Sequence, residues 1–342
     1  MMRETPLLAR YAESLFWMAR YMERVENLAR LLEVTQNFEA PGRERETWFG
    51  LVRINADEAA FAERGVPASA ESVKRFYLLD HGNPTSIPAS LNAARQNART
   101  LRPIISTEMW MQLNMLHREL VAIDPEELHG DRLSRLCSRI KLGVQTHTGV
   151  TEGTFFRDSG WAFYQLGRLL ERADQTTRLL DIRYHLLVPE AVEERRVVEL
   201  TQWGAVLRAA AGYHAFRRIA PAGFGPADVV DFLLTDAAFP RSVSLCLDQA
   251  EWLLSQLRGR YGLRGTVAAL ERVEELRAAL MGRSVERIIA DGLHQFLDAL
   301  QRDLILLSGE IGTAFFRDWR PLAVPAAEGK TQSMGGMTQS MG

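Results

Sequence analysis

The sequence predicts an all-α fold, a tandem-duplicated helical bundle whose two pseudo-symmetric halves pack as one body. Helix-forming Ala, Leu, Glu and Arg dominate the 342 residues, and apolar positions recur at helical spacing. Runs of alternating β-branched residues, which would indicate strands, are missing. In addition, the segment 14–32 recurs at 162–180 with the same charged residues at matching positions. These observations indicate a helical unit that is present twice.

The second copy follows the first through four blocks in the same order. After the opening helix, matches continue along the chain and end with Phe155-Phe156-Arg157-Asp158, which returns at 315–318. The intervening pairs are Trp48/Trp203, Arg53/Arg208, Phe61/Phe216, Phe76/Phe232, Leu78/Leu234, Asp80/Asp236, Pro84/Pro240, Ser86/Ser242 and Leu91/Leu247. Ordered blocks of this kind indicate an internal duplication. We therefore expect a first repeat at 1–150 and a second at 151–322, without a Pro/Gly/Ser-rich linker between them.

The composition narrows the class of protein. With 41 basic and 43 acidic residues, the chain lacks the basic excess of a general nucleic-acid binder. Cys137 and Cys246 lie far apart and form no disulfide or metal spacing, which fits a reduced, cytoplasmic setting. The first residues lack the apolar run of a signal peptide, and no run reaches the roughly 18 apolar residues of a membrane span. We expect no nucleic-acid and no membrane partner.

Proline and glycine divide the chain into roughly ten to twelve helices of ordinary length. The breaks fall at 39–42, 65–67, 81–84, Pro103, 124–125, 188–189, 221–226 and 239–240. The last stretch, 323–342, repeats TQSMG and has almost no large apolar residue after Pro325. This stretch is predicted to be a disordered tail.

The opening helix of each repeat carries a narrow polar stripe opposite a broad apolar face. Aromatic residues, Phe16 in one copy and Tyr164 in the other, lie within the stripe and suggest that it is at least partly buried. The identical residues are three arginines and one glutamate in each copy. They are Arg20, Glu23, Arg24 and Arg30 in the first copy and Arg168, Glu171, Arg172 and Arg178 in the second.

Three interpretations of this stripe are open. It is an ordinary solvent-facing charged surface, a buried arginine–glutamate network that joins the halves, or the lining of a groove for an anionic ligand. Exposed arginine exchanges with lysine at little cost, yet each copy keeps arginine, whose planar fork suits carboxylates and phosphates. This persistence favours the two buried interpretations, and the structural network ahead of the ligand groove.

A second shared element has the pattern Asp-x-x-x-Pro-x-Ser. Proline is expected at the first helical position, with the serine in the first turn and the aspartate near the free N–H groups. The ordinary interpretation is a well-formed helix start, and the functional one is an anion site at a helix N-terminus. The residues concerned are Asp80, Asn83 and Ser86 in the first repeat and Asp236 and Ser242 in the second.

Recognisable catalytic and cofactor motifs are missing from the sequence. It contains no phosphate-binding glycine loop, no GxSxG and no reactive-cysteine context. The pairs Glu126-x-x-His129 and Asp291-x-x-His294 have a spacing used by metal-binding bundles, but the two do not form a convincing set. The sequence therefore predicts no metal and no cofactor, and it leaves any catalytic residue unknown.

The repeated Glu-Arg strings resemble the alpha-E domain family, a bacterial helical domain named for that motif. The matching strings include YMERVEN at 21–27, GRLLERADQ at 167–175, NPTSI at 83–87, ARQNAR at 94–99 and ISTEMW at 105–110. Together they cover about residues 5–320. The second copy has Phe239 in place of Asn83, so any role of this asparagine belongs to one half.

The resemblance implies a setting rather than a reaction. Members are encoded beside, or fused to, circularly permuted ATP-grasp ligase-like proteins, transglutaminase-like proteins and an amino-terminal-nucleophile hydrolase. We therefore expect a non-catalytic helical component of a peptide synthesis or modification system, with the ATP-grasp ligase-like and transglutaminase-like proteins as partners and a peptide carboxylate as a further possible ligand. The alternative is an enzyme for peptides or amides, with Glu23 or Glu171 as acid/base and Arg24 or Arg172 as anion clamp.

Overall fold

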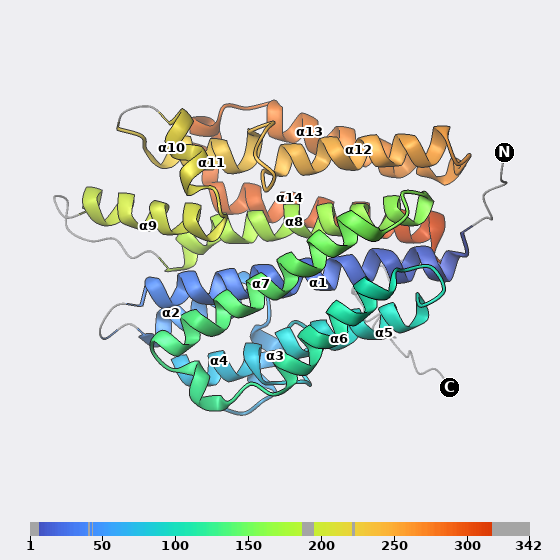
Figure 1. Cartoon of the computed structure of the whole chain (residues 1–342). Helices are drawn as coiled ribbons and strands as arrows, with labels where there is room; N and C mark the ends of the chain where they lie inside the picture. Colours follow the sequence, from blue (N-terminus) through green and yellow to red (C-terminus); the bar gives the residue numbers. More distant parts are fainter. Residues whose placement is uncertain (1–6, 40–41, 43, 187–194, 221–222, 317–342) are drawn as a thin grey trace, which may run out of the picture.

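The computed structural model describes residues 7–39, 42, 44–186, 195–220 and 223–316 (Figure 1). Within these ranges all the regular elements are helical, which confirms the predicted all-α class. None of the helices there is long and apolar enough to cross a bilayer. The tail expected at 323–342 lies outside the described residues.

The helices follow one another with short connections. Their bounds are α1 (Ala9–Asn37), α2 (Glu44–Ile54), α3 (Glu58–Ala62), α4 (Ala70–Leu78), α5 (Ile87–Thr100), α6 (Thr107–Val121), the 3-10 turn η1 (Pro125–Leu128), α7 (Asp131–Thr154), α8 (Ser159–Leu186), α9 (Arg195–Ala209), α10 (Tyr213–Ile219), α11 (Pro226–Thr235), α12 (Val243–Gly259), the 3-10 turn η2 (Arg264–Thr266), α13 (Val267–Met281) and α14 (Val285–Phe315).

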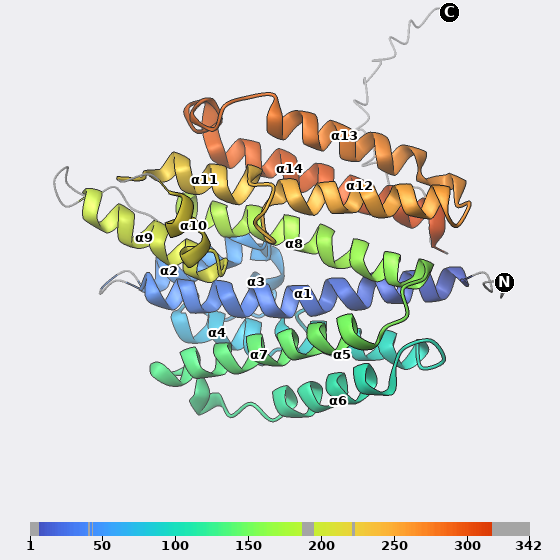
Figure 2. The same cartoon turned by 45° about the horizontal axis from the view of Figure 1, so that its top comes forward.

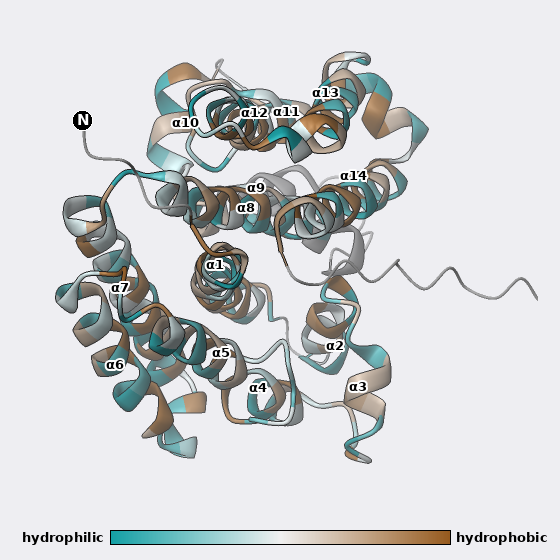
Figure 3. Ribbon diagram, turned by 90° about the vertical axis from the view of Figure 1, so that its right-hand side faces the viewer, coloured by the Kyte–Doolittle hydropathy of each residue, from teal (hydrophilic) through white to brown (hydrophobic). Residues whose placement is uncertain are grey.

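Two long helices, α1 and α8, lie side by side at the centre (Figures 1 and 2). The helices α5 and α7 pack on α1, with α6 outside them, and α12 and α14 pack on α8, with α13 outside (Figure 3). In addition, α2 contacts α8 and α9 contacts α1, so the helix that follows each long central helix reaches the other central helix. The buried apolar side chains accordingly form one continuous core.

The described part of the chain contains fourteen α-helices, more than the roughly ten to twelve expected. Two of the additional breaks come directly after α2 and α9. At these points Ala56 and Ala211 adopt left-handed backbone conformations, with φ of 55° and 56°. Alanine is a strong helix former, so these turns carry no signal in the sequence.

Candidate functional site

The polar stripes of the two opening helices face each other because α1 and α8 approach closely. Contacts advance in the same direction along both helices, from Gly167 against the backbone of Phe16 to Arg172 beside Glu23. A Cβ atom at Gly167 would overlap the Phe16 carbonyl, so glycine permits this approach. The charged residues that follow on each helix are thereby brought within hydrogen-bonding reach.

The Glu23 carboxylate is buried and is held by two arginines from the second half of the chain. Arg172 donates from Nε to Oε1 and from Nη2 to Oε2, both at 2.9 Å. Arg241 donates from Nη1 to Oε1 at 2.9 Å, and the amide of Asn27 lies 3.2 Å from the same oxygen. The paired contact of Arg172 uses the planar fork of guanidinium, which lysine cannot reproduce.

The Glu171 carboxylate has a matching arrangement with arginines from the first half. Arg24 donates from Nε to Oε1 at 2.7 Å and from Nη2 to Oε2 at 3.1 Å. Arg20 donates to Oε2 at 2.8 Å, and the Gln175 amide lies 3.3 Å from Oε1. Each glutamate of the Glu-Arg pairs therefore binds the arginine of the other pair, and both carboxylates are shielded from solvent.

Farther along the two helices, a second pair of arginines reaches helix ends in the opposite half. Arg30 bonds Glu26 and donates to the carbonyl of Ala209 at 2.8 Å. Arg178 bonds Asp174 and donates to the carbonyl of Ile54 at 2.7 Å. Ile54 and Ala209 are the last residues of α2 and α9. These guanidinium groups thus satisfy carbonyls that have no partner within their own helix.

Arg168 and Arg241 depart from the arrangement that the repeat suggested. Arg168 pairs with Glu152 at 3.2 Å, although its counterpart Arg20 binds Glu171. Arg241 was not among the predicted residues, yet it binds both Glu23 and Glu26, the latter at 2.7 Å. The predicted first repeat has Thr85 at the position expected to correspond, so the predicted repeat gave no signal for Arg241.

Electrostatics around the two glutamates favour the ionised form. Burial alone raises the pKa of the Glu23 carboxyl, but the charges of Arg172 and Arg241 outweigh it and hold the pKa well below its ordinary value. Burial likewise opposes ionisation of Glu171, and Arg24 and Arg20 again lower the pKa below the usual range. A general acid at neutral pH needs a raised pKa, so this result counts against the enzyme interpretation. Because the polar stripe is buried, it is not the solvent-facing charged surface that formed the first of the three interpretations.

The helix starts differ in detail from the prediction. Ser86 and Ser242 are the N-cap residues themselves, and Pro84 and Pro240 lie in the preceding turns rather than at the first helical position. Each hydroxyl accepts a backbone N–H three residues later, at 3.2 Å in α5 and 3.1 Å in α12. Each hydroxyl also donates to a carbonyl six residues earlier, so the serine bonds both the preceding turn and the first turn of the helix from the N-cap position.

The aspartates of these elements stabilise turns and do not cap the helices. Asp80 accepts from the N–H of Gly82 at 2.8 Å and from Arg64, and Asp236 accepts two backbone N–H groups of its own turn. Asn83 is fully buried, donates to the Phe76 carbonyl at 3.0 Å and accepts from the Thr85 N–H. The polar side-chain atoms of Asp80, Asn83 and Asp236 are therefore hydrogen-bonded within the protein.

The two pairs with metal-like spacing in the sequence are not brought together. Oε2 of Glu126 lies 3.7 Å from Nη1 of Arg132. Nε2 of His129 lies 3.7 Å from Oε2 of Glu71. Asp291 bonds Arg287 on its own helix at 3.0 Å. Neither Glu126/His129 nor Asp291/His294 forms a shared binding site.

The fold and these paired residues define a class of all-helical domain in which Glu-Arg pairs on two helices bind each other. The chain belongs to the family Alpha-E, described as a predicted alpha-helical domain with a conserved ER motif, which it matches over residues 7–316. This confirms the resemblance inferred from the Glu-Arg strings.

Curated relatives place the domain within longer proteins. Uncharacterized proteins of Mycobacterium bovis and Mycobacterium tuberculosis are 27% identical to this chain over 314 residues. The match covers 85% of this chain and 34% of each relative, so the chain spans about a third of their length. No solved structure matches the chain.

Proposed function

We propose that this chain is a non-catalytic helical component of a system that makes or modifies peptides. In this proposal it acts in the cytoplasm together with a circularly permuted ATP-grasp ligase-like protein and a transglutaminase-like protein. Membership of the Alpha-E family supports this setting. The observation that carries the non-catalytic role is the state of Glu23 and Glu171, which are buried, ionised and fully engaged with arginine.

We further infer that the Glu-Arg residues join two halves that arose by duplication and are related by a pseudo-twofold axis. Reciprocal contacts support this inference: Glu23 with Arg172 and Glu171 with Arg24. The bonds of Arg30 and Arg178 to the last residues of α9 and α2 are reciprocal in the same sense. Breaking a buried pair is costly, so such a network fixes the register of α1 against α8.

A peptide carboxylate would reach this network most easily at Arg24, its most exposed arginine. The Arg24 side chain is 23% exposed, compared with 13% for Arg172 and none for Glu171. An incoming carboxylate would bind Arg24 through Nη1, the guanidinium nitrogen that does not bond Glu171. Arg24 is therefore the residue at which the structural network and a ligand site would overlap.

The test is co-purification of the tagged chain with the neighbouring ATP-grasp protein, using wild type, Arg24→Lys and Glu23→Gln/Glu171→Gln. Circular dichroism and melting first establish which variants are folded. Retention of the complex by all folded variants assigns the motif to stability and another surface to the partner. Loss of the complex in folded Arg24→Lys places the contact at Arg24.

Two outcomes contradict the proposed function. One is turnover of peptide or amide substrates by the purified chain alone. The other is failure of the wild-type chain to form a complex with either partner on co-expression. The Arg24→Lys variant is informative in both assays because it keeps the positive charge while losing the paired donor geometry of guanidinium.

A further inference from the structure

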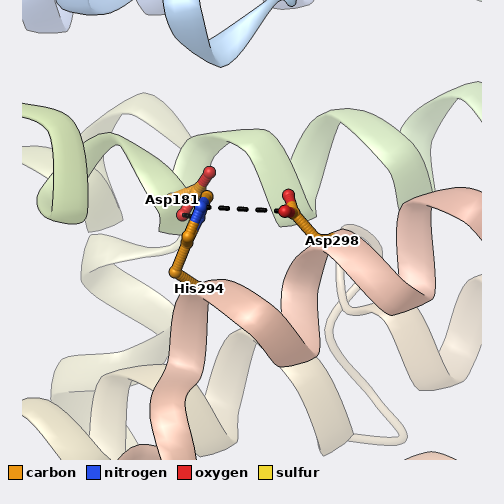
Figure 4. A group of neighbouring side chains, drawn as sticks. All are labelled: Asp181, His294 and Asp298. Atoms are coloured by element: carbon orange, nitrogen blue, oxygen red, sulfur yellow. Dashed lines mark hydrogen bonds and ion pairs between the residues drawn. The ribbon is translucent and has the colours of Figure 1, made fainter.

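A cluster of metal-ligating side chains lies between α8 and α14, about one helical turn beyond Arg178 on α8. It consists of Asp181 from α8 and of His294 and Asp298 from α14 (Figure 4). The Nδ1 atom of His294 lies 2.8 Å from Oδ1 of Asp181, and its Nε2 atom lies 3.7 Å from Oδ2 of Asp298. We propose that these three residues bind a divalent transition-metal cation such as Zn²⁺ or Mn²⁺.

The spacing of the three side chains suits a single ion. One ligand atom from each residue can be chosen so that all lie within 4.8 Å of one another. A cation with bonds of about 2.0–2.2 Å holds its ligand atoms at most about 4.4 Å apart. Asp181 and Asp298 face different nitrogens of the His294 ring. The Asp298 side chain, which is 44% exposed, would therefore turn toward the nitrogen that faces Asp181, while Asp181 is held at 5% exposure.

The positions on the helices match those of metal sites in helical bundles. His294 and Asp298 are four residues apart on α14 and therefore project from the same face. Asp181 projects from the facing helix, as Figure 4 shows. Such bundles build their metal sites from an imidazole and carboxylates on facing helices. The arrangement thus supplies ligands from two helices that are distant in sequence.

A backbone irregularity immediately precedes the cluster. Gly292 interrupts α14 with φ of 117° and ψ of 95°, so the segment that carries His294 and Asp298 is offset from the turn before it. This break separates His294 from Asp291, the neighbour that the sequence spacing suggested. Helix breaks of this kind frequently accompany functional sites.

The chemistry of the donor set selects a borderline cation. One imidazole nitrogen and two carboxylate oxygens suit Zn²⁺ or Mn²⁺ better than Ca²⁺, which prefers six or more oxygens. One imidazole nitrogen would bind the ion through its lone pair, and the two carboxylates would balance its charge. Since His294 and Asp298 are partly exposed, water can complete the coordination shell.

Titration calorimetry tests the proposal on the full chain, purified without a polyhistidine tag and freed of metal by a chelator. Zn²⁺ and Mn²⁺ are the probes, and Co²⁺ reports ligand geometry through its visible spectrum. We expect one ion per chain and a melting temperature that rises on binding. The variants His294→Gln and Asp298→Asn should weaken binding at least about tenfold.

Asp291→Asn is the matched control, because Asp291 lies on the same helix and pairs with Arg287 instead. It should bind the ion as the wild type does. Asp298→Asn changes a partly exposed side chain, so its fold is expected to persist, and melting without metal verifies this. Absence of Zn²⁺ and Mn²⁺ binding by folded wild type overturns the proposal. Equal binding by wild type and Asp298→Asn does so as well, and either result leaves the cluster as a hydrogen-bonded contact between α8 and α14.

Discussion

Replacing Glu23 with glutamine tests the energetic role of the buried Glu-Arg contacts. The change keeps the size of the side chain and removes the negative charge facing Arg172 and Arg241, whose side chains are only 13% and 11% exposed. Removing one partner of a buried pair costs about 3–5 kcal/mol. Because Glu26 still faces Arg241 at 2.7 Å, we expect the lower end, about 3 kcal/mol.

This free energy converts into a measurable change in melting temperature. An unfolding entropy of about 2.1 cal/mol/K per residue amounts to roughly 0.7 kcal/mol/K for a chain of 342 residues. A loss of about 3 kcal/mol therefore lowers Tm by about 4 °C at pH 7, which scanning calorimetry resolves. Adding Arg172→Gln should cost less than the sum of the single changes, because it removes the unpaired cation.

Glu274→Gln is the control, because Glu274 is an exposed residue of α13. Its expected effect is within about 0.5 kcal/mol of wild type. If Glu23→Gln melts within a degree of this control, the buried pairs contribute no net stability and the argument for a structural network fails.

Three further changes probe the same architecture. The folded-state pKa values of Glu23 and Glu171 lie below the ordinary 4.5, so the stability from their ionised forms is complete above pH 4.5 and is lost as pH falls further. Melting at pH 7, 4.5 and 3 should show this loss of stability, and the loss should be smaller in Glu23→Gln. A Tm that does not depend on pH would contradict the prediction. Gly167→Ala should lower the free energy of unfolding by about 1–3 kcal/mol in urea titrations, because the added Cβ overlaps α1. The control Gly149→Ala has open space around it and should be neutral or stabilising. Equal effects of the two changes would refute the close approach of α8 to α1. Ser242→Ala should cost about 1 kcal/mol through loss of the cap of α12, measured by thermal unfolding, and an unchanged Tm would argue against that cap.

The sequence predicted the helical class because helix propensity and apolar spacing are encoded within a few turns. It also identified most of the charged residues at the centre of the molecule, since the segments 14–32 and 162–180 keep arginine and glutamate at matching positions. The aromatics within the stripe correctly indicated burial: Phe16 and Tyr164 are almost completely shielded from solvent. Helical class and the burial of one helix face depend on residues within a few turns of each other, so a sequence pattern can reveal them.

The helix starts show where that reasoning reached its limit. Proline at the first helical position is a statistical preference, and the chain instead uses the hydroxyls of Ser86 and Ser242 as caps. Both serines bond a carbonyl six residues earlier as well as an N–H three residues later, so the turn before the helix decides its first residue. A local pattern alone does not determine such a boundary.

By itself, then, the amino-acid sequence determined that this protein is helical, that it belongs with the Alpha-E family, and which charged stripe lies at its centre. Only the tertiary structure decided how those charges pair: Glu23 with Arg172 and Arg241, or His294 with Asp181, which lies 113 residues away. Propensity and periodicity act over neighbouring turns, whereas the choice of an ion-pair partner depends on how closely distant helices pack. At Gly167 that approach depends on the absence of a side chain, and its consequence appears only when α1 is in place.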